Sequence, residues 1–120
     1  MKLYLNDTQR SYLLEILRAS ENNAVNGKDS ELAKAFNDLY QKIQPTNATY
    51  VNLDRGDAET VVEFCGIVRA SLDKAISFLD KDTERDPEEV ANLKKKAVDA
   101  RDEIQEVEDQ LQEKIRKNPV

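Results

Sequence analysis

Histidine and tryptophan are absent from this sequence of 120 residues, which holds one cysteine, three glycines and three prolines. Without histidine, the chain has no Ser–His or Cys–His nucleophile pair and no imidazole metal ligand. A single cysteine, Cys65, excludes an internal disulfide and an ordinary cysteine-based zinc site. We therefore expect no catalytic residue of these kinds, no metal site and no cofactor.

Long hydrophobic runs are also missing. None approaches the ~20 apolar residues that cross a bilayer, and the short apolar stretch after Met1-Lys2 is not the core of a signal peptide. The sequence therefore predicts a cytoplasmic protein without a membrane partner.

Charge is abundant and mostly acidic. The chain has 24 Asp and Glu against 18 Lys and Arg, a formal charge of -6, which argues against nonspecific binding to DNA because such binding needs basic side chains to replace counterions. Hydrophobic residues make up 39% of the chain, so one core of this size is marginal and self-association is a common remedy. Their regular spacing favours a folded chain over a disordered one.

Hydrophobic periodicity predicts two strand–helix–helix units. The pattern places strands over 3–5 and 48–53, helices over 8–20, 30–43 and 58–79, and connections over 21–28 and 80–85. Pro45 ends the second helix. The third helix carries most of the apolar residues, and among them Cys65 is expected to be a small core side chain rather than a nucleophile.

A long helix is predicted in the last third of the sequence. Asp86-Pro87-Glu88-Glu89 is typical of a helix start. From there to about Lys117, apolar residues follow the 3-4 spacing of a coiled-coil seam: Val90, Leu93, Ala97, Ala100, Ile104, Val107 and Leu111. Because ~30 helical residues span ~45 Å, we expect this helix to extend beyond the rest of the domain or to pair with a second copy. The spacing does not decide whether the seam pairs within one chain or between chains.

Together these elements predict a mostly α protein with two short β-strands (α+β) and a coiled-coil-like C-terminal helix. We expect a single domain over 1–120, made of the units 1–45 and 46–120, that assembles into a homodimer or higher oligomer through its helices and strands.

Three groups of residues are candidates for chemistry. The predicted turn Asp54-Arg55-Gly56-Asp57 suits a phosphate, because glycine admits a close ligand and Arg55 adds a cation beside outward-pointing helix amides. A simple capped turn is the alternative. Arg10, Arg18 and Arg69 form a second group, because arginine donates paired hydrogen bonds to phosphates. Scattered surface arginines are the alternative here.

Acidic residues on the last helix form the third group. Carboxylates one turn apart can hold Mg²⁺, as in all-helical nucleotide pyrophosphohydrolases, and Glu59 and Glu63 offer a second pair on the third helix. The acids of the last helix lie mostly off its apolar seam, so a solvated face is the alternative. They are Glu88, Glu89, Asp102, Glu103, Glu106, Glu108 and Asp109.

With two short strands, a buried helix and a long assembling helix, the chain resembles small early proteins of bacteriophages. It is most similar in size and layout to the first family of Thoeris anti-defence proteins, which sequester the cyclic nucleotide signals of bacterial immune enzymes. The resemblance implies an oligomer of intertwined dimers without catalytic turnover. It also implies interface pockets for a cyclic ADP-ribose derivative and, in larger members of the assembly, separate pockets for cyclic di- or trinucleotides.

The resemblance also implies which residues bind the ligand. Arg55 and Arg101 are the candidates for phosphate, Phe78 for stacking on the base and Asn92 for hydrogen bonding to it. Arg10 and Arg18 are candidates for a second site. Core packing is the alternative for Phe78, and Asn92, next to Leu93 of the seam, is alternatively a polar residue that specifies an interface.

We therefore expect a phage-encoded, non-enzymatic protein in the cytoplasm of an infected bacterium. By binding cyclic nucleotide immune signals it would inhibit anti-phage defence. Two alternatives remain open: an acidic helical module that inhibits a host protein by imitating nucleic-acid charge, and a Mg²⁺-dependent nucleotide pyrophosphohydrolase.

Overall fold

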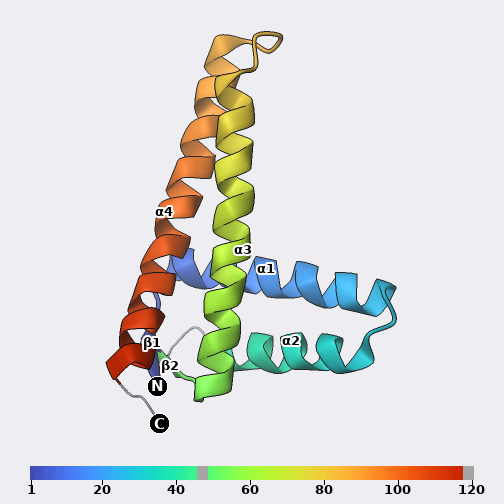
Figure 1. The fold of residues 1–120 in the computed structure, drawn as a ribbon, viewed down its shortest axis with the longest axis vertical. Coiled ribbons are helices and arrows are strands. Elements are labelled where there is room, and N and C mark those ends of the chain that lie inside the picture. Colours follow the sequence, from blue (N-terminus) through green and yellow to red (C-terminus); the bar gives the residue numbers. More distant parts are fainter. Residues whose placement is uncertain (46–48, 118–120) are drawn as a thin grey trace. The chain divides into compact units, whose positions relative to one another are not determined.

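The computed structural model describes residues 1–45 and 49–117. Its elements are β1 (Lys2–Tyr4), α1 (Asp7–Asn26), α2 (Ser30–Ile43), β2 (Tyr50–Asn52), α3 (Arg55–Asp80) and α4 (Pro87–Lys117) (Figure 1). The chain divides into two compact units, Met1–Asp57 and Ala58–Val120. The predicted class, mostly α with two short strands, is confirmed. Within the described residues, no helix is long and apolar enough to span a membrane.

The two strands form an antiparallel sheet in the first unit. Leu3 pairs with Val51 at its centre, and both side chains are buried. On the other face the rings of Tyr4 and Tyr50 lie 5.9 Å apart, as expected for a directly opposed aromatic pair. Both strands were predicted within one or two residues, and Ala48, the predicted start of the second, lies outside the described residues.

Helix α1 is longer than the sequence predicted. Asn6 caps it in a reciprocal pair with Gln9. The expected loop over 21–28 is wrong for most of its length, because the helix continues to Asn26 and buries Ala24. No glycine or proline interrupts the chain before Gly27, so the polar residues of the last turn remain helical.

The turn between α1 and α2 is built on Lys28 rather than on the neighbouring glycine. Lys28 has φ 61°, whereas Gly27 has φ -81°. The amides of Lys28 and Asp29 return to the last carbonyls of α1, and the Asp29 carboxylate accepts from the Leu32 amide to cap α2. Helix α2 then buries Phe36, Leu39 and Ile43 and ends before Pro45, as predicted.

Helix α3 begins earlier than predicted. The Asp54 carboxylate accepts from the Asp57 amide at 2.7 Å, so Asp54 is the capping residue and Arg55–Asp57 are the first helical turn. The predicted turn over 54–57 is therefore wrong in its extent, and the structure matches the capped start that the sequence left open. Gly56 lies in this first turn, where a Cβ would stand 3.4 Å from the capping Asp54 carboxylate oxygen.

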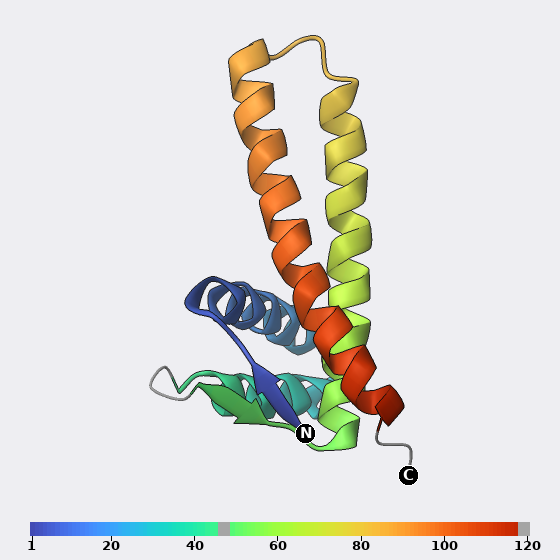
Figure 2. The same cartoon turned by 90° about the vertical axis from the view of Figure 1, so that its left-hand side faces the viewer.

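Helices α3 and α4 lie side by side and antiparallel in the second unit (Figures 1 and 2). Ion pairs join them, among them those made by Lys94, Arg101 and Glu108 of α4. Each directly follows a residue of the predicted seam, so the seam of α4 faces α3 of the same chain. In its lower half Ile104, Val107 and Leu111 are fully buried. The pairing that the sequence left open is therefore found within one chain.

Candidate functional site

The six predicted ligand-binding residues are divided between the two units. Arg10, Arg18 and Arg55 belong to Met1–Asp57, and Phe78, Asn92 and Arg101 belong to Ala58–Val120. We describe the two groups in turn.

Arg10 is a buried residue of the first unit. It is 4% exposed, and its guanidinium donates to the Ile43 carbonyl at 2.7 Å and to the Pro45 carbonyl. These carbonyls lie at the C-terminal end of α2, where a cation is favoured and where helices leave acceptors without intrahelical donors. Arg10 thus fastens α1 to the end of α2, a position that gives it a structural role.

Arg18 lies on the exposed surface between α1 and α2. Its guanidinium is 4.1 Å from the centre of the Tyr40 ring and 2.9 Å from the Glu21 carboxylate. A hydrogen bond to Tyr40 and the charge of Glu21 raise the pKa of Arg18. Asn22, Glu15 and neighbouring side chains complete a shallow hollow of about 420 Å³. This hollow presents both charges, so it has no strong preference for an anion.

Arg55 stands in the first turn of α3, half-buried. The helix start around it is already neutralised: Asp54 caps it, and the Asp57 carboxylate is paired with Lys42 at 2.5 Å. Carboxylates at a helix N-terminus occupy the position that a phosphate would take. The structure therefore places Arg55 beside a helix end that is satisfied by the chain itself.

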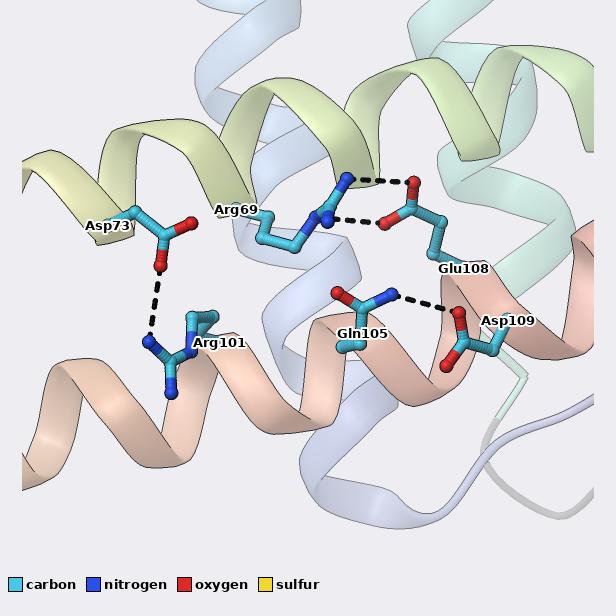
Figure 3. Close-up of polar contacts among 6 residues, drawn as sticks. All are labelled: Arg69, Asp73, Arg101, Gln105, Glu108 and Asp109. Carbon is cyan, nitrogen blue, oxygen red and sulfur yellow. Dashed lines mark hydrogen bonds and ion pairs between the residues drawn. The ribbon is translucent and has the colours of Figure 1, made fainter.

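Polar contacts between α3 and α4 hold Arg101 in the second unit (Figure 3). The guanidinium of Arg101 is 3.2 Å from Asp73 of α3 and 3.5 Å from Asp102. Further along the hairpin, Arg69 meets the buried Glu108 with two contacts of 3.1 and 3.2 Å. Arg101 is thus one of a series of ion pairs that fix the two helices.

Phe78 projects from the loop end of the same hairpin. Phe78 is 68% exposed, although most residues of its type are buried. It borders a hollow of about 490 Å³ that is also lined by Lys81, Asp82, Thr83, Glu84 and Arg85. The alternative of core packing for Phe78 is therefore excluded by its exposure.

Asp82 organises the loop that forms this hollow. Its carboxylate accepts from the amides of Glu84 and Arg85 and pairs with the Arg85 guanidinium at 3.3 Å. On the far side of the loop, Asp86 caps α4 through the Glu88 amide. These hydrogen bonds and this ion pair within the loop hold it in place, so an ordered connection forms the hollow.

Helical periodicity decides which candidates share a side of the hairpin. At about 100° per residue, Phe78 on α3 and Asn92 on α4 are each turned about 120° from the seam, towards the same side. Arg101 is turned to the opposite flank, where it meets Asp73. The ion pair of Asp80 with Lys94 sets the register, which leaves Phe78 and Asn92 about 6 Å apart along the axis. Phe78 and Asn92 therefore lie on one flank of the hairpin and Arg101 on the other, although both side chains turn away from the seam and Asn92 does not line the hollow beside Phe78.

The remaining chemical candidates have no reactive environment. Burial raises the pKa of the Cys65 thiol to about 12, so it stays protonated. Glu59 and Glu63 are both exposed on α3. Across residues 1–45 and 49–117, no group of three or more His, Cys, Asp or Glu side chains is placed to hold a metal ion.

Fold and surface together define a mostly helical protein whose second unit is an antiparallel helical hairpin with an aromatic residue exposed at its loop end. Comparison with known proteins adds no relative: no family model matches the sequence, and no curated protein or solved structure matches it either. The similarity in layout to the Thoeris anti-defence proteins stays a prediction.

Sequence reasoning missed the cations of the loop-end hollow. Lys81 and Arg85 lie in the segment interpreted only as a charged connection. One signal was present: Asp82 precedes Glu84 and Arg85 at the spacing of a side chain that bonds the backbone two and three residues on. That spacing predicts an ordered turn, and an ordered turn beside an aromatic residue is a candidate site.

Proposed function

We propose that this chain is a non-enzymatic binding protein that sequesters cyclic nucleotides at the loop end of the α3–α4 hairpin. The observation that carries the proposal is the exposed ring of Phe78 beside Lys81 and Arg85. The ring offers a stacking face, and the two cations beside it offer donors for phosphate oxygens, so one surface carries both kinds of group that bind a nucleotide.

Each part of a nucleotide has a matching group at this end of the hairpin. The face of Phe78 suits stacking on a base, which is typically worth about 1–3 kcal/mol. Lys81 supplies a mobile cation and Arg85 a planar one for phosphate oxygens. Asn92 lies on the same flank but outside the lining of the hollow, and it offers an amide for the edge of a base that extends beyond the hollow. The preference for cyclic nucleotides, and a role for a phage against bacterial immunity, rest on the resemblance in layout.

The experiment is a retention assay with the purified full chain. Protein is mixed with cyclic ADP-ribose isomers and cyclic di- and trinucleotides, passed through a size filter, and then heat-denatured. Sequestration predicts that one nucleotide leaves the filtrate and returns intact on denaturation. A filtrate that keeps every nucleotide, or a released species that has been hydrolysed, contradicts the proposal.

A pair of variants localises the site. Phe78→Ala is expected to weaken retention by about tenfold to a hundredfold, because stacking is lost. Tyr4→Ala is the matched control, since Tyr4 is an aromatic residue with 51% exposure in the other unit. Equal losses in both variants would place binding elsewhere.

A further inference from the structure

Helix α3 carries a second stripe on its exposed side. Glu63, Ile67, Lys74 and Phe78 are all exposed, and Lys81 continues the stripe beyond the helix end. The small residues Ala70, Ser71 and Ser77 fill the positions between them, which completes a 3-4 spacing. A regular seam with no partner in its own helix pair is a candidate contact surface.

The stripe cannot be explained by α4. Each of its residues is turned by about 120° or more from the seam at which α4 packs, at 100° per residue. Ile67 is 63% exposed and Phe78 68% exposed, whereas the seam residues Val61, Cys65 and Ile76 of the same helix are buried. Two large apolar side chains on one line of a helix favour burial against another surface.

The stripe on one copy of α3 is complementary to the same stripe on a second copy that runs in the opposite direction. Carboxylate Glu63 stands near one end and ammonium Lys81 at the other, while Ile67 and Phe78 lie symmetrically inside them. Two such helices placed antiparallel would set Ile67 against the partner's Phe78 and Glu63 against the partner's Lys81. A parallel arrangement would instead set like charges against each other. The charge order therefore selects an antiparallel second copy.

We propose that a second copy of this chain packs its α3 antiparallel along this stripe, as an isologous two-fold dimer. Ala70 and Ser71, near the two-fold axis, let the helix backbones approach. Lys74 also lies near the axis, where its stem covers apolar surface and its ammonium reaches solvent. Phe78 contributes one face of its ring to this contact and borders the loop hollow with the rest. Because every group in the contact belongs to one of the two copies, the dimer does not depend on any nucleotide.

Two large apolar side chains per chain make a small interface, so the dimer belongs to the transient class. Light scattering over a concentration series is therefore the measurement. The mass is expected to rise from 13.7 kDa towards twice that value. Ile67→Lys is expected to raise the dissociation constant at least about tenfold, because symmetry repeats the substitution in both chains. Val25→Lys, a change at an apolar residue with 59% exposure in the other unit, is the matched control.

Charge variants test the antiparallel register. Glu63→Lys and Lys81→Glu are each expected to weaken the dimer, and the double variant to restore it, since the opposed pair then has both signs reversed. Lys74→Ala is expected to tighten it by removing two like charges near the axis. Circular dichroism is expected to show that each variant stays helical, because every substituted position is exposed.

A wild-type chain that keeps a mass of 13.7 kDa throughout the series overturns the proposal. So does a dimer that Ile67→Lys leaves intact, or a double charge variant that fails to recover. A wild-type chain that dimerises but retains no nucleotide would instead contradict the proposed function alone.

Discussion

Arg10 shows how a single side chain can be interpreted in two ways until its surroundings are known. As one of few arginines in an acidic chain it is a reasonable phosphate ligand. Its guanidinium is instead buried and donates to the carbonyls of Ile43 and Pro45. A guanidinium that is itself buried and already donates to the buried Ile43 carbonyl and to the Pro45 carbonyl has little capacity for a ligand.

The variant Arg10→Met is expected to lower the free energy of unfolding by about 2–3 kcal/mol, because it removes a charged hydrogen bond to the buried Ile43 carbonyl and a second one to the Pro45 carbonyl. Chemical denaturation followed by circular dichroism measures this loss. Arg18→Met is the control, and a much smaller change is expected because Arg18 is exposed on the same helix. An Arg10→Met protein with unchanged stability and lost nucleotide retention would restore the ligand role.

At the scale of elements, periodicity predicted the helices and strands well but not their ends. The start of α4 was found because Asp86-Pro87 combines a cap with a fixed φ. The end of α1 was missed because polar residues favour a loop by composition, while burial of Ala24 keeps that segment helical. The start of α3 was missed because Asp54 and Asp57 are equally good caps, and only the hydrogen bond distinguishes them.

The two partners of the ion pair between Arg69 and Glu108 differ in burial. The Glu108 side chain is 6% exposed and that of Arg69 is 38% exposed. Arg69→Met should therefore cost about 3–5 kcal/mol, because it leaves a carboxylate buried without its partner. Glu108→Met should cost clearly less, since the guanidinium can turn to water.

A double-mutant cycle in chemical denaturation checks this asymmetry. The variant with both methionines is expected to recover most of the stability lost in Arg69→Met, because no uncompensated charge remains. Asp73→Ala, at an exposed partner of Arg101 on the same helix pair, is the control and should change stability little. Equal costs for the two single variants would contradict the asymmetry.

At the scale of the whole molecule, the sequence predicted the class of fold but not the site. Six candidate residues came from composition and resemblance, and the structure places them in two units, with only Phe78 and Asn92 on a common side of one hairpin. The reason is geometric. Whether a charged side chain faces water, a carbonyl or a neighbouring helix depends on register, and register follows from packing that no local pattern encodes.

The buried thiol links the stability of the molecule to alkaline pH. Burial raises the pKa of Cys65 to about 12 in the folded state, whereas the unfolded chain has the ordinary value of about 8.5. Below the unfolded value both states hold the proton, so stability is complete. As pH rises from about 9 to about 12 only the unfolded state ionises, and stability falls by up to about 1.4 kcal/mol per pH unit.

Comparing the wild type with Cys65→Ala isolates this contribution, because tyrosines and lysines titrate alike in both proteins. The difference in unfolding free energy between them is expected to be constant up to about pH 8.5 and to shrink above it. A difference that stays constant to pH 11 would mean that the thiolate is tolerated where Cys65 lies.

The pairing of β1 with β2 has a consequence for the order of folding. The sheet joins Tyr4 to Tyr50, and both α1 and α2 lie in the segment between them. Closing so long a segment costs chain entropy that a few backbone bonds only partly offset. The α3–α4 hairpin closes through the short connection after Asp80, so its first contacts are local. The smallest elements of the fold are therefore expected to be the last to form, with their amides gaining protection from hydrogen exchange after those of the helices.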